Sequence, residues 1–160
     1  MLKVPENKTL KRLRITQCIL FLALILLCTS TFISGYDSKG DVYYRTVFDM
    51  LSYIGGQVPN SATGQAFSTY VLFYLVFPVI PTIGFFFCAL DKEYNIKNFV
   101  SVICCLLGVV SILTIVTLNF IQIGSLLSLL IYLLLSFLST YAMLARIAQP
   151  KSEKDKNESK

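Results

Sequence analysis

The sequence contains no histidine and no tryptophan. Histidine is the side chain that most often serves as a general acid or base, and it is a common metal ligand. Its absence excludes catalytic sets of the Ser-His-Asp and Cys-His types and any histidine-based metal site. All five cysteines lie within or at the edges of apolar segments, and none lies in the polar loop at residues 34–66. We therefore expect no disulfide framework and no metal site, and interpret the cysteines as small apolar packing residues.

Charge is also missing over a long stretch. Between Lys97 and Arg146, 48 consecutive residues include no Asp, Glu, Lys or Arg. A charge at the centre of a bilayer costs at least a few kcal/mol, so this run predicts a hydrocarbon environment. The hydrophobic content of 55% exceeds the roughly 45–50% of soluble domains. The apolar segments contain no carboxylate pair for acid–base catalysis and no other ionisable group. We therefore expect neither an enzyme nor a cofactor, and proton-coupled transport is disfavoured.

Four segments have the length of a membrane span, for which about 20 apolar residues are needed. We predict an all-α, polytopic membrane protein with four transmembrane helices at residues 15–33, 67–90, 98–118 and 123–145. Asn119, Gln122 and Gly124 predict a tight turn between the third and fourth spans. The first span follows a basic lead, but it is longer than a signal peptide core and has no small-residue cleavage site. We therefore predict that it is retained.

The basic residues predict the orientation. Residues 1–14 hold five Lys or Arg, the turn at 91–97 holds two and residues 146–160 hold five, whereas the loop at 34–66 holds only two. If the chain crosses four times, the twelve Lys or Arg of residues 1–14, 91–97 and 146–160 all lie on one side of the membrane. The positive-inside rule makes that side cytoplasmic. The expected location is the bacterial inner membrane, with both termini in the cytoplasm. Because the basic residues flank apolar segments, we predict no direct nucleic-acid site.

The domain organisation follows from these assignments. Residues 1–14 form a cytoplasmic basic lead, residues 15–146 form the membrane domain, and residues 147–160 form a tail of mixed charge that is expected to be disordered in the cytoplasm. The lipid bilayer is therefore the first predicted partner. Oligomeric state is not readable from these features.

The outer loop contains the one patterned segment outside the predicted spans. Residues 42–54 place apolar and aromatic side chains on one helical face and polar side chains on the other, which predicts an amphipathic helix ending at Gly55-Gly56. Arg45 and Asp49 have the spacing of an i, i+4 ion pair. This helix either lies on the outer membrane surface or caps the bundle. The candidate contacts for a partner are Tyr43, Tyr44, Arg45, Asp49 and Tyr53.

Two further patterns lie within the predicted spans. Pro78 and Pro81 predict a kink in the second span, near mid-membrane. Small residues separated by four positions are typical of surfaces at which membrane helices approach closely. They are most simply interpreted as packing within the protein's own bundle, although a partner helix would use the same surface. The candidate helix-packing residues are Cys104, Gly108, Gly124, Ser128, Ser136 and Thr140.

The architecture resembles a family of phage proteins. The basic lead Lys8-Thr9-Leu10-Lys11-Arg12-Leu13-Arg14, the length, the polytopic character and the lack of catalytic residues are similar to superinfection exclusion protein A of short-tailed temperate phages. This resemblance covers the whole chain at the level of architecture and carries over no site residues. It implies a prophage-encoded inner-membrane protein that blocks entry of superinfecting phage DNA by non-enzymatic contact with membrane-inserted ejection proteins.

Two alternatives stay open. The loop from Gly35 to Gln65 and the short second outer turn also resemble four-span immunity proteins against pore-forming colicins, which implies a pore-forming toxin as the partner. The third alternative is a small carrier or channel subunit, suggested by the Pro78 and Pro81 kink because broken helices line transport sites. The absence of Trp and of loop cysteines excludes the claudin pattern.

Overall fold

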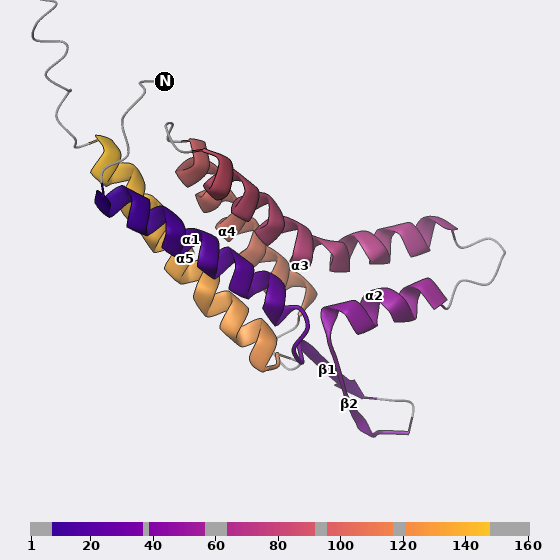
Figure 1. Cartoon of the computed structure of the whole chain (residues 1–160). Coiled ribbons are helices and arrows are strands. Elements are labelled where there is room, and N and C mark those ends of the chain that lie inside the picture. The colour runs from indigo at the N-terminus through magenta and orange to yellow at the C-terminus, as the bar shows by residue number, and fades with distance from the viewer. Residues whose placement is uncertain (1–7, 37–38, 57–63, 92–95, 117–120, 148–160) are drawn as a thin grey trace, which may run out of the picture.

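The computed structural model describes residues 8–36, 39–56, 64–91, 96–116 and 121–147. These residues form five helices and one two-stranded hairpin, arranged as Figure 1 shows. In chain order the elements are α1 (Lys8–Leu27), β1 (Ile33–Tyr36), β2 (Val42–Arg45), α2 (Val47–Gly56), α3 (Gly64–Leu90), α4 (Ile96–Ile115) and α5 (Ile123–Ile147).

The four long helices form a bundle. Contacts join α1 to α3, α3 to α4, α4 to α5 and α5 to α1, so each long helix packs against two neighbours. We call the end at which α1 and α4 begin and α3 and α5 end the charged end, and the opposite end the hairpin end (Figure 1). The helices α4 and α5 are each long and apolar enough to cross a membrane.

The long helices agree with the predicted spans to within a few residues, except at the first span. The helix α1 begins at Lys8 and ends at Leu27, whereas the prediction was 15–33. The basic lead is thus helical from Lys8 onward. After Leu27 the chain turns, and the hydroxyls of Thr29 and Ser30 donate to the carbonyls of Leu26 and Leu27 at 2.7 and 2.6 Å. The backbone N–H groups of Thr29 and Ser30 donate to the same two carbonyls at 3.0 Å, so the last carbonyls of α1 are satisfied within this turn and the helix ends before the apolar run does.

The outer loop contains a hairpin that the sequence analysis missed. The strands β1 and β2 pair antiparallel, with Ile33 opposite Arg45 and Tyr36 opposite Val42, and Gly40 in the turn has a φ of +84°. The prediction of helix over residues 42–54 is therefore wrong for its first five residues and correct from Val47 onward. The segment Val42-Tyr43-Tyr44 is rich in side chains that suit strands. Pairing with β1, a contact distant in sequence, selects the strand.

Buried residues on α4 and α5 recur with alternating steps of three and four. This spacing is the 3.5-residue period of helices that supercoil around one another. The buried seams are unusually polar or small, and leucines face outward. The seam of α4 includes Asn98, Ser101, Cys105, Gly108 and Ile112, and that of α5 includes Ser125, Ser128, Tyr132, Leu135, Ser139, Ala142 and Arg146.

The outward faces of the bundle are apolar. Only 33% of the most apolar stretch of α4, and the same share in α5, is buried. Leu130, Leu133 and Leu134 of α5 are each 50–54% exposed, and comparable residues occur on α1, α3 and α4. Soluble monomers rarely expose large contiguous apolar patches, and apolar surface on helices is what lipid contacts.

The helix α3 bends where it leaves the bundle. Figure 1 shows its first part lying beside α2 and its second part lying beside α1 and α4. Pro78 and Pro81 both lie inside α3. Each proline lacks the N–H that would bond to the carbonyl four residues earlier, and its ring displaces that carbonyl, so a bend is expected on the N-terminal side of each. The hydroxyl of Thr82 donates to the carbonyl of Pro78 at 2.7 Å.

Candidate functional site

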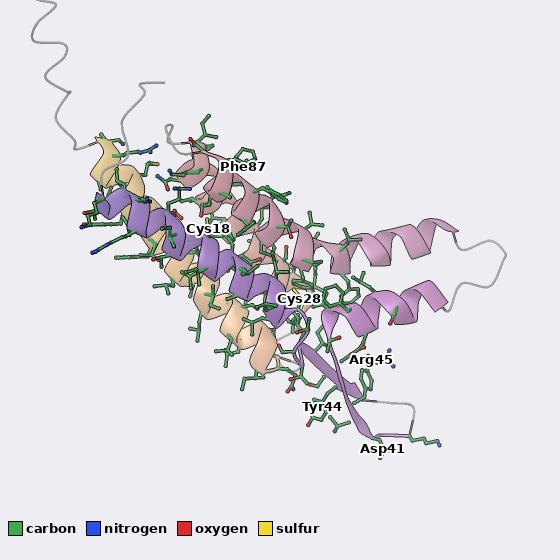
Figure 2. The ribbon with its side chains drawn as sticks, in the orientation of Figure 1. Cys18, Cys28, Asp41, Tyr44, Arg45 and Phe87 are labelled. Atoms are coloured by element: carbon green, nitrogen blue, oxygen red, sulfur yellow. The ribbon has the colours of Figure 1, made fainter. Side chains whose placement is uncertain are left out.

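The candidate contact residues Tyr43, Tyr44 and Arg45 lie on strand β2 rather than on a helix. Successive side chains of a strand alternate between its two sides. Tyr43 and Arg45 are half-buried on one side, and the Arg45 guanidinium lies 5.0 Å from the centre of the Tyr43 ring. Val42 and Tyr44 are 52% and 60% exposed on the other side. Figure 2 shows Tyr44 and Arg45 projecting from opposite sides of the hairpin and Asp41 at its tip.

Gly35 explains the position of the Tyr43 ring. A Cβ atom at Gly35 would overlap that ring, so the absence of a side chain at Gly35 lets the Tyr43 ring lie against the backbone of β1. The ring then supports the Arg45 guanidinium by a cation–π contact. Of the two candidate tyrosines on β2, Tyr44 is therefore the exposed one and Tyr43 is half-buried.

Asp49 belongs to the start of α2. The Thr46 backbone N–H and hydroxyl both donate to the Asp49 carboxylate, at 3.0 and 2.7 Å, and the Asp49 backbone N–H donates to the Thr46 hydroxyl oxygen at 3.0 Å. This reciprocal arrangement is a capping box, which satisfies N–H groups that open the helix. The hydrogen bonds from Thr46, and to a smaller extent the charge of Arg45, lower the pKa of Asp49. The role of Asp49 is thus to begin α2, which the Thr-x-x-Asp spacing indicates and the sequence analysis overlooked. Tyr53 lies in α2, and its side chain falls outside the described residues.

The hairpin is anchored to the end of the bundle. Ile33 bridges to Ile121, and the Gln122 side-chain amide donates to the Ser34 hydroxyl at 2.9 Å. The N–H of Gly124 donates to the carbonyl of Thr31 at 3.0 Å. These contacts bind the root of β1 to the start of α5, so the hairpin is held in a set orientation.

The start of α2 is anchored in the same way. Val47 is fully buried, and its N–H donates to the carbonyl of Cys28 at 3.2 Å. Phe32, just before β1, is buried with its ring centre 4.9 Å from that of Phe77 on α3. The first turn of α2 and the residue before β1 therefore pack against the hairpin end of the bundle. This part of the segment agrees with the interpretation in which the segment caps the bundle.

Four of the six candidate packing residues are buried between helices of the bundle. A Cβ atom at Gly108 of α4 would overlap the Tyr132 ring of α5, and one at Gly124 would overlap the Ser30 hydroxyl in the turn after α1. Cys104 and Ser128 are buried as well. These close approaches are internal. Ser136 is only half-buried and Thr140 is exposed, with its hydroxyl donating to the Ser136 carbonyl at 2.9 Å.

A buried polar cluster, which the sequence analysis missed, connects three helices. It consists of Gln17 on α1, Asn98 and Ser101 on α4, and Ser139 on α5, each 0–1% exposed. The Gln17 Nε2 donates to the Ser139 hydroxyl oxygen at 2.9 Å and, at the longer distance of 3.4 Å, to Asn98 Oδ1. The hydroxyls of Ser101 and Ser139 are 2.7 Å apart. Gln17 Oε1 is buried without a hydrogen-bond donor among the described residues.

The sequence does carry a signal for this cluster. Ser128 and Ser139 belong to the three-and-four spacing of α5, and Asn98 and Ser101 to that of α4. Polar residues at this spacing among leucines indicate a polar seam inside a membrane bundle. The pattern of small side chains four positions apart includes Gly108, but it does not include Asn98 or Ser139.

Basic side chains at the charged end cap the end of α3. The Arg14 guanidinium donates to the Ala89 carbonyl at 3.4 Å, and the Lys97 ammonium donates to the Asp91 carbonyl at 2.8 Å. The C-terminus of a helix carries partial negative charge, so cations are favourable there. The Asp91 carboxylate accepts from the Lys97 N–H at 3.0 Å, which satisfies a donor at the start of α4. These contacts let Lys97 be buried with 3% of its surface exposed.

The described residues hold no group of three or more His, Cys, Asp or Glu side chains placed to bind a metal ion. The described residues combine an anchored hairpin that exposes Val42 and Tyr44, a polar cluster inside the bundle and apolar outward faces. No family model, curated protein or solved structure matches this chain.

Proposed function

We propose that all four long helices cross the bacterial inner membrane, with the charged end in the cytoplasm and the hairpin outside. Two observations support this placement. Each long helix has an exposed apolar face, including Ile19 on α1 and Phe86 on α3. Among the described residues of these helices and the α3–α4 turn, the charged side chains gather at one end of the bundle, as the positive-inside rule requires of a cytoplasmic face.

The function that this arrangement supports best is superinfection exclusion. In this proposal a prophage-encoded protein blocks entry of superinfecting phage DNA by contacting the ejection proteins that conduct it. The observation that carries the proposal is the anchored hairpin, which holds Val42 and Tyr44 exposed on the outer side. Exposed aromatic side chains on a rigid support are typical of binding surfaces, because little conformational entropy is lost when they bind.

Expression of the gene alone tests the proposal. We expect phage adsorption to be unchanged while transfer of the phage genome into the cell fails. The variant Tyr44→Ala should restore genome entry. Its matched control is Tyr141→Ala, because Tyr141 is 54% exposed against 60% for Tyr44 and lies near the opposite end of the bundle. Normal genome entry into cells with the unaltered protein in their membranes would refute exclusion.

Immunity against a pore-forming toxin is the second candidate, and one observation favours it. Thr140 is exposed on α5, and half-buried Ser136 lies one turn away. Small hydroxyl residues on a lipid-facing surface allow close approach of a foreign helix. Immunity predicts survival in a spot test with one pore-forming colicin and no effect on phage. Thr140→Leu should abolish that protection.

A further inference from the structure

One face of α1 combines exposed cations with exposed apolar side chains in a continuous line. Positions 8, 12, 15, 19, 22 and 26 are separated by alternating steps of four and three, so they share one helical face. Arg12 is exposed, as is the adjacent Lys11, and four apolar residues follow on the same face. We call this line the α1 stripe; its apolar members are Ile15, Ile19, Leu22 and Leu26, which are 47%, 60%, 48% and 62% exposed.

The opposite face of α1 is buried in the bundle. Gln17, Phe21 and Leu24 are 0–2% exposed, and Phe21 packs into the space left by Gly84 on α3. The two faces of α1 are therefore distinct, and the stripe faces outward from the protein. Arg14 is turned toward the end of α3, where it donates to the Ala89 carbonyl, and it adds positive charge beside the stripe without belonging to it.

The apolar part of the stripe runs along most of α1. Ile15 and Leu26 are eleven residues apart, which at 1.5 Å per residue is about 16 Å. Lys11 and Arg12 lie at the charged end of the stripe, on the side where the proposed crossing places the cytoplasmic lipid headgroups. Basic side chains at this position attract anionic headgroups, and each is worth about a fivefold increase in affinity.

We propose that the α1 stripe binds an anionic phospholipid, such as phosphatidylglycerol or cardiolipin. The lipid phosphate contacts Lys11 and Arg12, and the acyl chain lies along Ile15, Ile19 and Leu22. The ligand is identified by charge complementarity at one end of the stripe and by apolar contact along the rest. This inference rests on the proposed membrane placement of α1 and does not require superinfection exclusion.

Lipid retention by the purified full-length protein tests the proposal. The protein in a neutral detergent is incubated with phosphatidylglycerol or with zwitterionic phosphatidylcholine of the same chain length, and bound lipid is counted by native mass spectrometry. We expect preferential retention of phosphatidylglycerol that weakens as salt is raised. Arg12→Gln should reduce it about fivefold, and Arg12→Lys should preserve most of it.

Lys39→Gln is the matched control. Lys39 is an exposed cation in the hairpin, so its loss removes the same charge far from the stripe and should leave retention unchanged. Equal retention of the two lipids, or equal losses in Arg12→Gln and Lys39→Gln, would overturn the proposal. Extraction of the native protein from membranes by alkaline carbonate would overturn it together with the membrane placement. Normal phage entry alongside selective lipid retention would remove only the exclusion function.

Discussion

At the scale of single residues, the molecule is organised by where its few polar side chains find partners. Gln17 is fully buried, and its amide nitrogen is satisfied by Ser139 and Asn98 from two other helices. Exposed hydroxyls behave differently: those of Thr16 and Thr140 donate to carbonyls of their own helix four residues earlier. A hydroxyl that bonds within its own helix can face lipid at little cost, whereas a buried amide needs other helices around it.

Replacement of Ser139 tests the buried cluster. Ser139→Ala removes the better acceptor for Gln17 Nε2 and the partner of the Ser101 hydroxyl, so we expect a loss of about 1–2 kcal/mol in the free energy of unfolding. Thr140→Ala removes an adjacent hydroxyl that bonds only within α5 and should cost less than half as much. Unfolding by SDS in mixed micelles measures both. Equal losses would show that the cluster contributes nothing specific.

The capping box of α2 makes a pH prediction. The folded pKa of Asp49 is lowered, so its stabilisation of the helix is present above the unfolded pKa and is lost as pH falls through the folded value. We expect hydrogen-exchange protection of the first turn of α2 to decrease below about pH 4. Asp49→Asn should have weaker protection at neutral pH and little change on acidification. Asp41→Asn, at the hairpin tip, should behave as the native chain does; a native acid response in Asp49→Asn would contradict the assignment.

At the scale of elements, close helix packing depends on small residues facing large ones. Gly108 on α4 accommodates the Tyr132 ring from α5, and Gly84 on α3 accommodates the Phe21 ring from α1. The missing side chains let the rings fill the interior while the helix backbones stay close. The seams repeat every 3.5 residues, so α4 and α5 present the same faces to each other along their length.

A double-mutant cycle tests the contact between α4 and α5. Gly108→Ala places a methyl group where the Tyr132 ring lies, and we expect a loss of about 1–3 kcal/mol in the free energy of unfolding. Tyr132→Leu shortens the side chain and destabilises by itself, since Tyr132 is buried. The double variant should lose at least 1 kcal/mol less than the sum of the single losses. Strict additivity would mean that the two residues do not meet.

At the scale of the whole molecule, the interior is more polar than a soluble core and the exterior is more apolar. Ser101, Ser125 and Ser139 are fully buried, while leucines such as Leu126 and Leu130 of α5 are about half exposed at 49% and 54%. Lipid provides no hydrogen bonds, so polar groups are satisfied inside, and apolar surface needs no covering. This distribution is what the proposed four crossings require.

Site-directed labelling tests the proposed topology. In a background with all five cysteines replaced by alanine, Lys39→Cys should react with a membrane-impermeant maleimide in spheroplasts, because the proposal places the hairpin outside. Arg12→Cys should react only after the membrane is permeabilised, because the proposal places the charged end in the cytoplasm. Both positions are exposed in the structure, so access depends on the side of the membrane. Labelling of Arg12→Cys in intact spheroplasts would refute the orientation.

Most of the helices were predictable from the sequence because their positions follow from local patterns of apolar, charged and turn residues. The absence of charge from Asn98 to Ala145 and the turn residues that divide this run identify α4 and α5 within two or three residues at each end. The helix at 47–54 was also predictable from its periodicity. The end of α1 was not, because the apolar run continues past Leu27 although the chain turns there, with the last carbonyls of α1 accepting from residues of the turn.

The candidate sites were predictable only in part. Sequence spacing identified Gly108 and Gly124 as points of close approach, but Tyr43, Tyr44 and Arg45 were predicted to lie on a helix and lie on a strand. Strand pairing joins segments that are distant in sequence, and local periodicity cannot detect it.

The sequence by itself determined that this protein is mostly helical and apolar. It also determined that histidine is absent and that positive charge flanks the apolar segments. Tertiary structure alone decided that Gln17, Asn98 and Ser139 meet inside the bundle and that Tyr44 and Arg45 project from opposite sides of a hairpin. The physical reason is that composition and periodicity are properties of one segment, whereas a buried hydrogen bond and a strand partner each require a second one.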